Sequence, residues 1–210
     1  MSLVPNFRGT YDGFFGQGEH AALGGARGVV LGQTVITEAE ETALGFATSG
    51  SGVDVVRIGA NAAANGNDST TVGDHAISEL QGTAVGSAAW AAADGSTAVG
   101  FAADAQGTNS VAVGLNATAV DATSTDAIAI GRDTMCTGAD TIAIGRAAVA
   151  DVAGGIALGT GANVSATHLL AVVVPGAGIN VGSVAVPANS DAQLSILVNG
   201  AQYYIPLVTN

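Results

Sequence analysis

A glycine recurs ten times along this 210-residue chain at an almost constant interval. The spacings between successive members are 13, 14, 14, 13, 14, 14, 17, 14 and 14 residues. The ten are Gly32, Gly45, Gly59, Gly73, Gly86, Gly100, Gly114, Gly131, Gly145 and Gly159. Because each unit of such a repeat must bury its apolar face against its neighbours, the period indicates a solenoid. So regular a chain has little sequence left for a unique catalytic constellation, and we expect no enzyme.

Each repeat alternates in a way that predicts two short strands. Counted from the glycine, position −1 is always a branched aliphatic residue and position −3 is always β-branched, as in Ile142 and Ile144 before Gly145. Positions +3 and +5 are mostly alanine, as in Ala103 and Ala105. Such alternation is typical of strands with one buried face. We therefore expect the residues at −3, −1, +3 and +5 to point inward, with the glycine in a turn that has no room for a Cβ.

Two strands and two turns in about 14 residues make one coil of a narrow parallel β-roll, with about ten coils over residues 29–167. Position −2 would then face outward, and it is mostly alanine. A row of small apolar side chains allows close packing between chains. Three rods packed in this way around one axis form a closed, symmetric assembly. The alanines expected at this homotrimer interface are Ala98, Ala112, Ala129, Ala143 and Ala157.

The charge pattern excludes several classes of protein. The chain has no lysine, five arginines and 17 carboxylates, for a net charge of −12, which would repel nucleic acid. A single cysteine excludes an intrachain disulfide. No apolar run is long enough for a membrane helix, and no signal peptide is evident at the first residues, so we expect a soluble protein made in the cytosol.

Individual reactive side chains indicate no catalytic, cofactor or metal site. Cys136 occupies an inward +5 position, which predicts a small core residue and not a nucleophile. His75, with Asp74 and Glu79 nearby, is expected to be solvated and not to hold a metal. Trp90 lies between two inward alanines and should point outward, toward either a ligand or a neighbouring subunit.

The two ends differ from the repeat. Residues 1–28 contain nearly half of the nine aromatic side chains, and they form either an attachment segment or a cap over the first coil. The aromatic residues are Phe7, Tyr11, Phe14 and Phe15. Residues 168–210 are expected to form a small antiparallel β tip, with a hairpin turn at Asn199-Gly200 and Tyr203 and Tyr204 near the contacts between chains.

The repeated phrase, seen in Ser110-Val111-Ala112-Val113-Gly114-Leu115-Asn116-Ala117, resembles the head repeat of trimeric autotransporter adhesins, the YadA-like heads. The resemblance covers roughly residues 29–164. It implies a left-handed parallel β-roll that is homotrimeric and belongs to a surface-exposed fibre that adheres to a host. Similar repeats occur in fibre proteins of phages and other viruses, which are assembled in the cytosol.

We expect a non-enzymatic structural or adhesive module of a phage or virus fibre, located on a virion. Its partners would be two further copies of the chain, other virion or tail proteins through the N-terminal segment, and a host surface receptor. The alternative is a fragment of a bacterial adhesin head on the cell surface. A solenoid carbohydrate-active enzyme is a weaker alternative, because the roll offers no identifiable pair of catalytic carboxylates.

Overall fold

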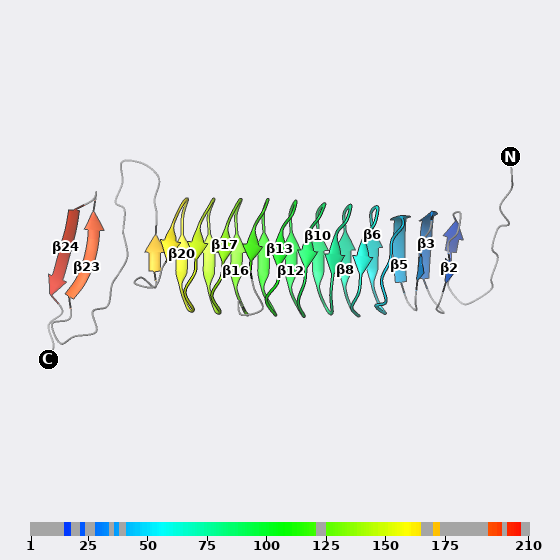
Figure 1. Cartoon of the computed structure of the whole chain (residues 1–210), viewed down its shortest axis with the longest axis horizontal. Helices are drawn as coiled ribbons and strands as arrows, with labels where there is room; N and C mark the ends of the chain where they lie inside the picture. Colours follow the sequence, from blue (N-terminus) through cyan, green and yellow to red (C-terminus); the bar gives the residue numbers. More distant parts are fainter. Residues whose placement is uncertain are drawn as a thin grey trace.

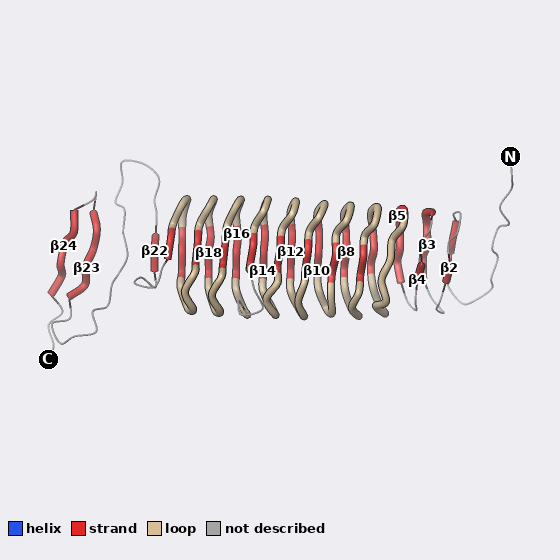
Figure 2. Tube along the Cα trace, in the orientation of Figure 1, coloured by secondary structure: helices blue, strands red, loops and turns tan. Residues whose placement is uncertain are grey.

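The computed structural model describes residues 41–120 and 125–164 throughout, and outside these ranges only individual strands. The described part is a parallel β-solenoid without helices, as predicted. Its strands lie side by side across a rod, and the sequence runs from one end of the rod to the other (Figure 1). The turns that connect the strands line both edges (Figure 2).

The solenoid has two parallel sheets, one for each strand of the repeat. The twelve-stranded sheet contains β1 (Phe15–Gln17), β3 (Gly28–Gln33), β5 (Glu41–Phe46), β6 (Val56–Ile58), β8 (Thr70–Val72), β10 (Thr83–Val85), β12 (Thr97–Val99), β14 (Val111–Val113), β16 (Ile128–Ile130), β18 (Ile142–Ile144), β20 (Ile156–Leu158) and β22 (Leu170–Val172). The eight-stranded sheet contains β7 (Ala63–Ala64), β9 (Ile77–Ser78), β11 (Trp90–Ala91), β13 (Asp104–Ala105), β15 (Thr118–Ala119), β17 (Met135–Cys136), β19 (Val149–Ala150) and β21 (Asn163–Val164).

Equivalent positions of successive coils stack on one another. Strands β12 and β14, for example, pair Thr97 with Val111, Ala98 with Ala112 and Val99 with Val113. The repeated glycine permits this stacking: Gly100 has a φ of +137°, and a Cβ there would lie 2.3 Å from the carbonyl oxygen of Gly114 in the next coil. The expected tight turn at the glycine is therefore confirmed.

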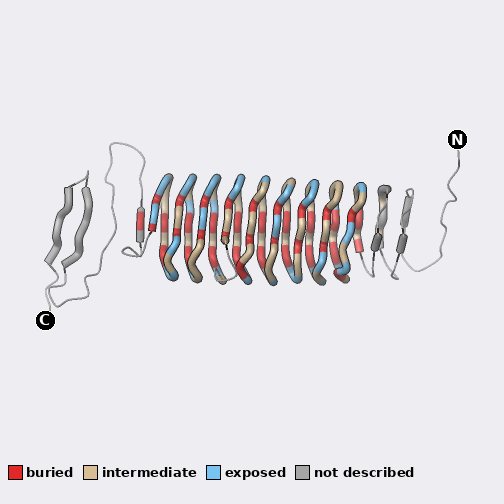
Figure 3. Tube along the Cα trace, viewed as in Figure 1, coloured by how far each residue is buried: buried red, intermediate tan, exposed pale blue. Residues whose placement is uncertain are grey.

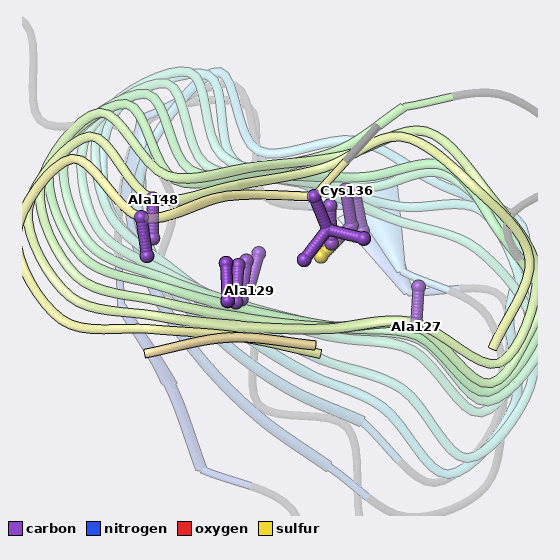
Figure 4. Packing of buried hydrophobic residues seen from close by; sticks show 11 residues of the cluster. Ala127, Ala129, Cys136 and Ala148 are labelled. Atoms are coloured by element: carbon purple, nitrogen blue, oxygen red, sulfur yellow. The ribbon is translucent and has the colours of Figure 1, made fainter. Parts of the chain in front are cut away.

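Alanine is the most frequent residue in the interior of the roll. In the described coils, positions −4, −2, +3 and +5 point inward, and buried residues alternate with less buried ones along the strands from β5 to β21 (Figure 3). Figure 4 shows the two sheets facing one another across a thin interior, with Ala129 projecting from one wall and Cys136 and Ala148 from the other. The inward direction of positions +3 and +5 is confirmed.

The predicted inward direction of positions −3 and −1, and the outward direction of position −2, are wrong. The alanines at −2 are inside the roll, where each has 0% exposed surface within a single chain, so they cannot contact another protomer. These are Ala98, Ala112, Ala129, Ala143 and Ala157. The larger residues at −3 and −1 point outward instead, as in β14, where Val111 and Val113 flank buried Ala112. The branched side chains at −3 and −1 are thus on the outer face, and from β10 to β20 the inward position between them is alanine.

Several predictions concern the ends of the chain. Strands β1 and β22 both belong to the twelve-stranded sheet, so this sheet extends beyond the expected boundaries at residues 29 and 167. Strands β2 (Ala22–Leu23) and β4 (Ile36–Thr37) form a small parallel pair. Strands β23 (Gln193–Val198) and β24 (Ala201–Pro206) are antiparallel and pair Val198 with Ala201, as an Asn-Gly hairpin requires.

The other expected features of the two ends fall outside the described residues. Phe7, Tyr11 and Phe14 belong to this group. Phe15 is described only as the first backbone position of β1.

Candidate functional site

The outer face of the twelve-stranded sheet carries two rows of uncharged branched side chains, here called the aliphatic stripe; position −1 is aliphatic throughout, and position −3 is aliphatic or threonine. It consists of the residues at −3 and −1 from β5 to β20, none of which is charged. Position −1 contributes Leu44, Ile58, Val72, Val85, Val99, Val113, Ile130, Ile144 and Leu158; position −3 contributes Thr42, Val56, Thr70, Thr83, Thr97, Val111, Ile128, Ile142 and Ile156. In the single chain Ile58 and Ile144 are each 40% exposed. A contiguous apolar row of this kind marks a contact surface.

The eight-stranded sheet presents a more mixed outer face. Its +4 positions include Trp90, Asp104, Thr118 and Met135 on neighbouring strands. Trp90 is 44% exposed, which confirms its predicted outward direction. Asp104 accepts a hydrogen bond from Gln106 Nε2 at 2.7 Å, and partial burial raises the pKa of its carboxyl.

Cys136 is a core residue, as expected from its +5 position. It has no exposed surface, and its Sγ donates a hydrogen bond to the Ile128 carbonyl at 3.3 Å. Burial raises the pKa of the thiol, which keeps it protonated at neutral pH. We expect such a thiol to react slowly with alkylating reagents.

An unexpected feature of the interior is a polar segment near the beginning of the fully described part. Arg57 occupies an inward −2 position and forms an ion pair with Glu41 at 2.5 Å, and both side chains are buried. One coil further, the hydroxyls of Thr71 and Ser78 share a short hydrogen bond inside the roll. Sequence reasoning missed this segment because it placed position −2 outside; an arginine in an otherwise alanine row was the available signal.

His75, Asp74 and Glu79 were expected to be solvated and not to hold a metal. His75 Nδ1 lies 2.9 Å from Asp74 Oδ1, with both side chains exposed. Glu79 lies elsewhere on the surface and accepts a hydrogen bond from Asn65 Nδ2 at 3.0 Å. Across residues 41–120 and 125–164, no group of three or more histidine, cysteine or acidic side chains is arranged to hold a metal ion.

None of the described segments contains a helix that is long and apolar enough to cross a membrane.

Comparison with known proteins agrees with the repeat and its geometry. No curated protein matches the chain. A family model described as the YadA head domain repeat, which spans 2 copies of the unit, matches residues 78–103, 105–134 and 137–162. The matched ranges contain the coils in which the aliphatic stripe and the alanine interior are most regular. Residues 78–162 of this chain are therefore a run of YadA head domain repeats.

Proposed function

We propose that this chain forms a homotrimeric adhesive head in which three rolls pack together through their aliphatic stripes. The observation that carries the proposal is the stripe itself, an unbroken apolar ladder on one face of the solenoid. The YadA head is a structural adhesin module and not an enzyme family, which supports a non-enzymatic role.

The alanine interior explains why association would be needed. A methyl group buries little apolar area, and burial stabilises a fold by about 25 cal/mol for each Å². The larger aliphatic side chains, which would bury most, are on the outside of the single chain. Packing three identical stripes around a common axis removes this surface from water and leaves no stripe unpartnered.

The trimer is tested by two substitutions in one coil. Ile144→Glu places a charge in the stripe, whereas Val149→Glu places the same charge on the outer face of the eight-stranded sheet. Light scattering after size-exclusion chromatography should give a trimer for the native chain and for Val149→Glu, and a monomer for Ile144→Glu. A trimer that survives Ile144→Glu but not Val149→Glu would assign the interface to the other sheet.

We further propose that the head is displayed on a surface, as an exported bacterial adhesin. The match to the YadA head favours this setting over a virus or phage fibre, which uses similar repeats. Residues 1–14, which precede β1 and include Phe7, Tyr11 and Phe14, would attach the head to its support. The β23–β24 hairpin would then form part of the distal tip, with Tyr203 and Tyr204 near the contacts between chains.

Immunogold microscopy with an antibody against residues 41–164 distinguishes the two settings. Labelling of the bacterial surface supports an exported adhesin, and labelling of purified particles would assign the chain to a virion. A chain without residues 1–14 should remain trimeric but should no longer be detected on the bacterial surface or on particles. Full occupancy by the truncated chain would show that attachment occurs elsewhere.

A further inference from the structure

Trp90 stands out on the outer face of the eight-stranded sheet because it is a large aromatic side chain that its own chain leaves 44% exposed. It lies in register with Ile77 of β9 on one side and with Asp104 of β13 on the other. Because the alternating positions Ser78, Ala91 and Ala105 are buried, Trp90 and its two neighbours all project outward. Stacked strands are about 4.8 Å apart, so Trp90 and Asp104 occupy directly neighbouring positions on this face.

A second carboxylate flanks the indole from the preceding coil. Glu79 follows β9 and donates its backbone N–H to the Ala91 carbonyl, which places its side chain opposite Ala92, two residues beyond Trp90 on the same face. Trp90 therefore lies between two acidic residues: Asp104 is directly in register with it on one neighbouring coil, and Glu79 is diagonal to it on the other.

Neither carboxylate is neutralised by a cation in the described residues. Asn65 Nδ2 donates to Glu79 Oε1 at 3.0 Å, and Gln106 Nε2 donates to Asp104 Oδ2 at 2.7 Å, so both recorded side-chain partners are neutral amides. Asp104 Oδ1 has no exposed surface and no hydrogen-bond partner. Burying part of a carboxylate without a counter-charge is unfavourable, so a cation brought to this face would be stabilised.

The chain supplies few cations of its own. It has no lysine and a net charge of −12. Of the arginines in residues 41–120 and 125–164, Arg57 is buried inside the roll, and Arg132 and Arg146 are on the turn that follows the twelve-stranded sheet. The charge around Trp90 is therefore complementary to a positively charged partner and would repel an anionic one.

We propose that Trp90, Glu79 and Asp104 form a docking site for an arginine side chain in a basic segment of a partner protein. The guanidinium would stack on the exposed indole, an arrangement in which cation–π attraction adds to apolar contact. Its N–H groups would donate charge-assisted hydrogen bonds to the carboxylates on the two adjacent coils. The site is on the sheet opposite the aliphatic stripe, so it does not depend on the proposed trimer.

Trp90 is the single tryptophan of the chain, so its fluorescence reports on the site directly. The full-length protein is titrated at low ionic strength with acetyl-Gly-Arg-Gly-Arg-Gly-amide, and in parallel with the same peptide carrying citrulline in place of arginine. Citrulline keeps the shape of arginine but has no charge. The arginine peptide should change Trp90 emission in a saturable way, the citrulline peptide should not, and salt should weaken the binding.

Three single-charge variants separate a defined site from the general negative field of the protein. Asp104→Asn and Glu79→Gln should each weaken binding of the arginine peptide by about two- to tenfold, because each removes one of the flanking charges. Asp151→Asn removes the same charge at a position equivalent to Glu79 but on a distant coil, and should leave the affinity unchanged.

Three outcomes would overturn the proposal. Equal loss of affinity in all three variants would mean that only the net charge attracts the peptide. An equal response to the citrulline peptide would exclude a cation site. A response to cellobiose, used as a neutral probe, with none to the arginine peptide would assign the face to saccharides.

Discussion

The interior of this roll has two regions with the same backbone and different contents. From β10 to β20, every −2 position is alanine. In the two preceding coils the −2 positions are Arg57 and Thr71, equally buried, and the strands remain in register with their neighbours. The inter-coil ladder and the turn glycines therefore hold the coils in register whether the inward side chains are methyl groups or polar groups.

The difference between the two regions lies in what their side chains require. Alanine needs no partner. The guanidinium of Arg57 is held by Glu41 from the preceding strand, and the Thr71 hydroxyl by Ser78 from the same coil. At position −2, the two polar side chains thus each have a polar side-chain partner inside the roll, as buried charges and hydroxyls require.

Removing one member of the buried ion pair should lower the free energy of unfolding more than the other substitutions considered below. Arg57→Met leaves Glu41 as a buried carboxylate without its guanidinium, and we expect a loss of about 3–5 kcal/mol in the free energy of unfolding. Denaturant unfolding measures this loss. Adding Glu41→Gln to Arg57→Met removes the isolated charge and should recover part of the stability. No recovery in the double variant would mean that the arginine acts by packing alone.

Enlarging a side chain in the alanine region should have the next largest effect. Ala112→Leu inserts three carbons between two sheets that have no space for them, and should cost about 1–3 kcal/mol. Val113→Leu, one residue later, changes an outward position and is the matched control, with an expected change of less than about 0.5 kcal/mol in monomeric protein. Equal costs in the two variants would contradict the inward direction of Ala112.

Converting the hydroxyl pair to the alanine pattern should have the smallest effect. Thr71→Val removes a hydroxyl and deprives Ser78 of a buried partner, at a cost of about 1–2 kcal/mol. Thr71→Val combined with Ser78→Ala makes this coil like those of the alanine region and should be more stable than the single variant. A double variant less stable than Thr71→Val would show that the two regions are not interchangeable.

Much of this fold could be predicted from the sequence, and the main error has a physical explanation. The period and its alternation predicted two short strands for each coil and the parallel stacking. Alternation divides a strand into two sets of residues, however, and does not say which set faces inward. A shift by one residue exchanges the buried set with the exposed set. We expected the larger residues to be inside, as in thick cores. Here the branched residues are on the outside, and the small residue between them, at position −2, faces the interior.

The candidate interaction sites were less accessible to sequence reasoning. The exposure of Trp90 followed from its place between two alanines, but its neighbours did not. Asp104 and Glu79 become its neighbours only through the stacking register. This register pairs Trp90 with Asp104 on one side and with Ile77, two residues before Glu79, on the other. The buried pair of Arg57 and Glu41 depends on the same register between adjacent coils.

The central claim, that the aliphatic positions face other chains while the alanines face the interior, is tested by cysteine cross-linking across one strand. In a Cys136→Ala background, Val111→Cys, Ala112→Cys and Val113→Cys are each oxidised in the native state and run on non-reducing gels. An interior cysteine is compatible with the fold, as Cys136 shows. We predict disulfide-linked dimers for position 111 or 113 and none for position 112. Dimers at position 112 with none at its two neighbours would contradict the account.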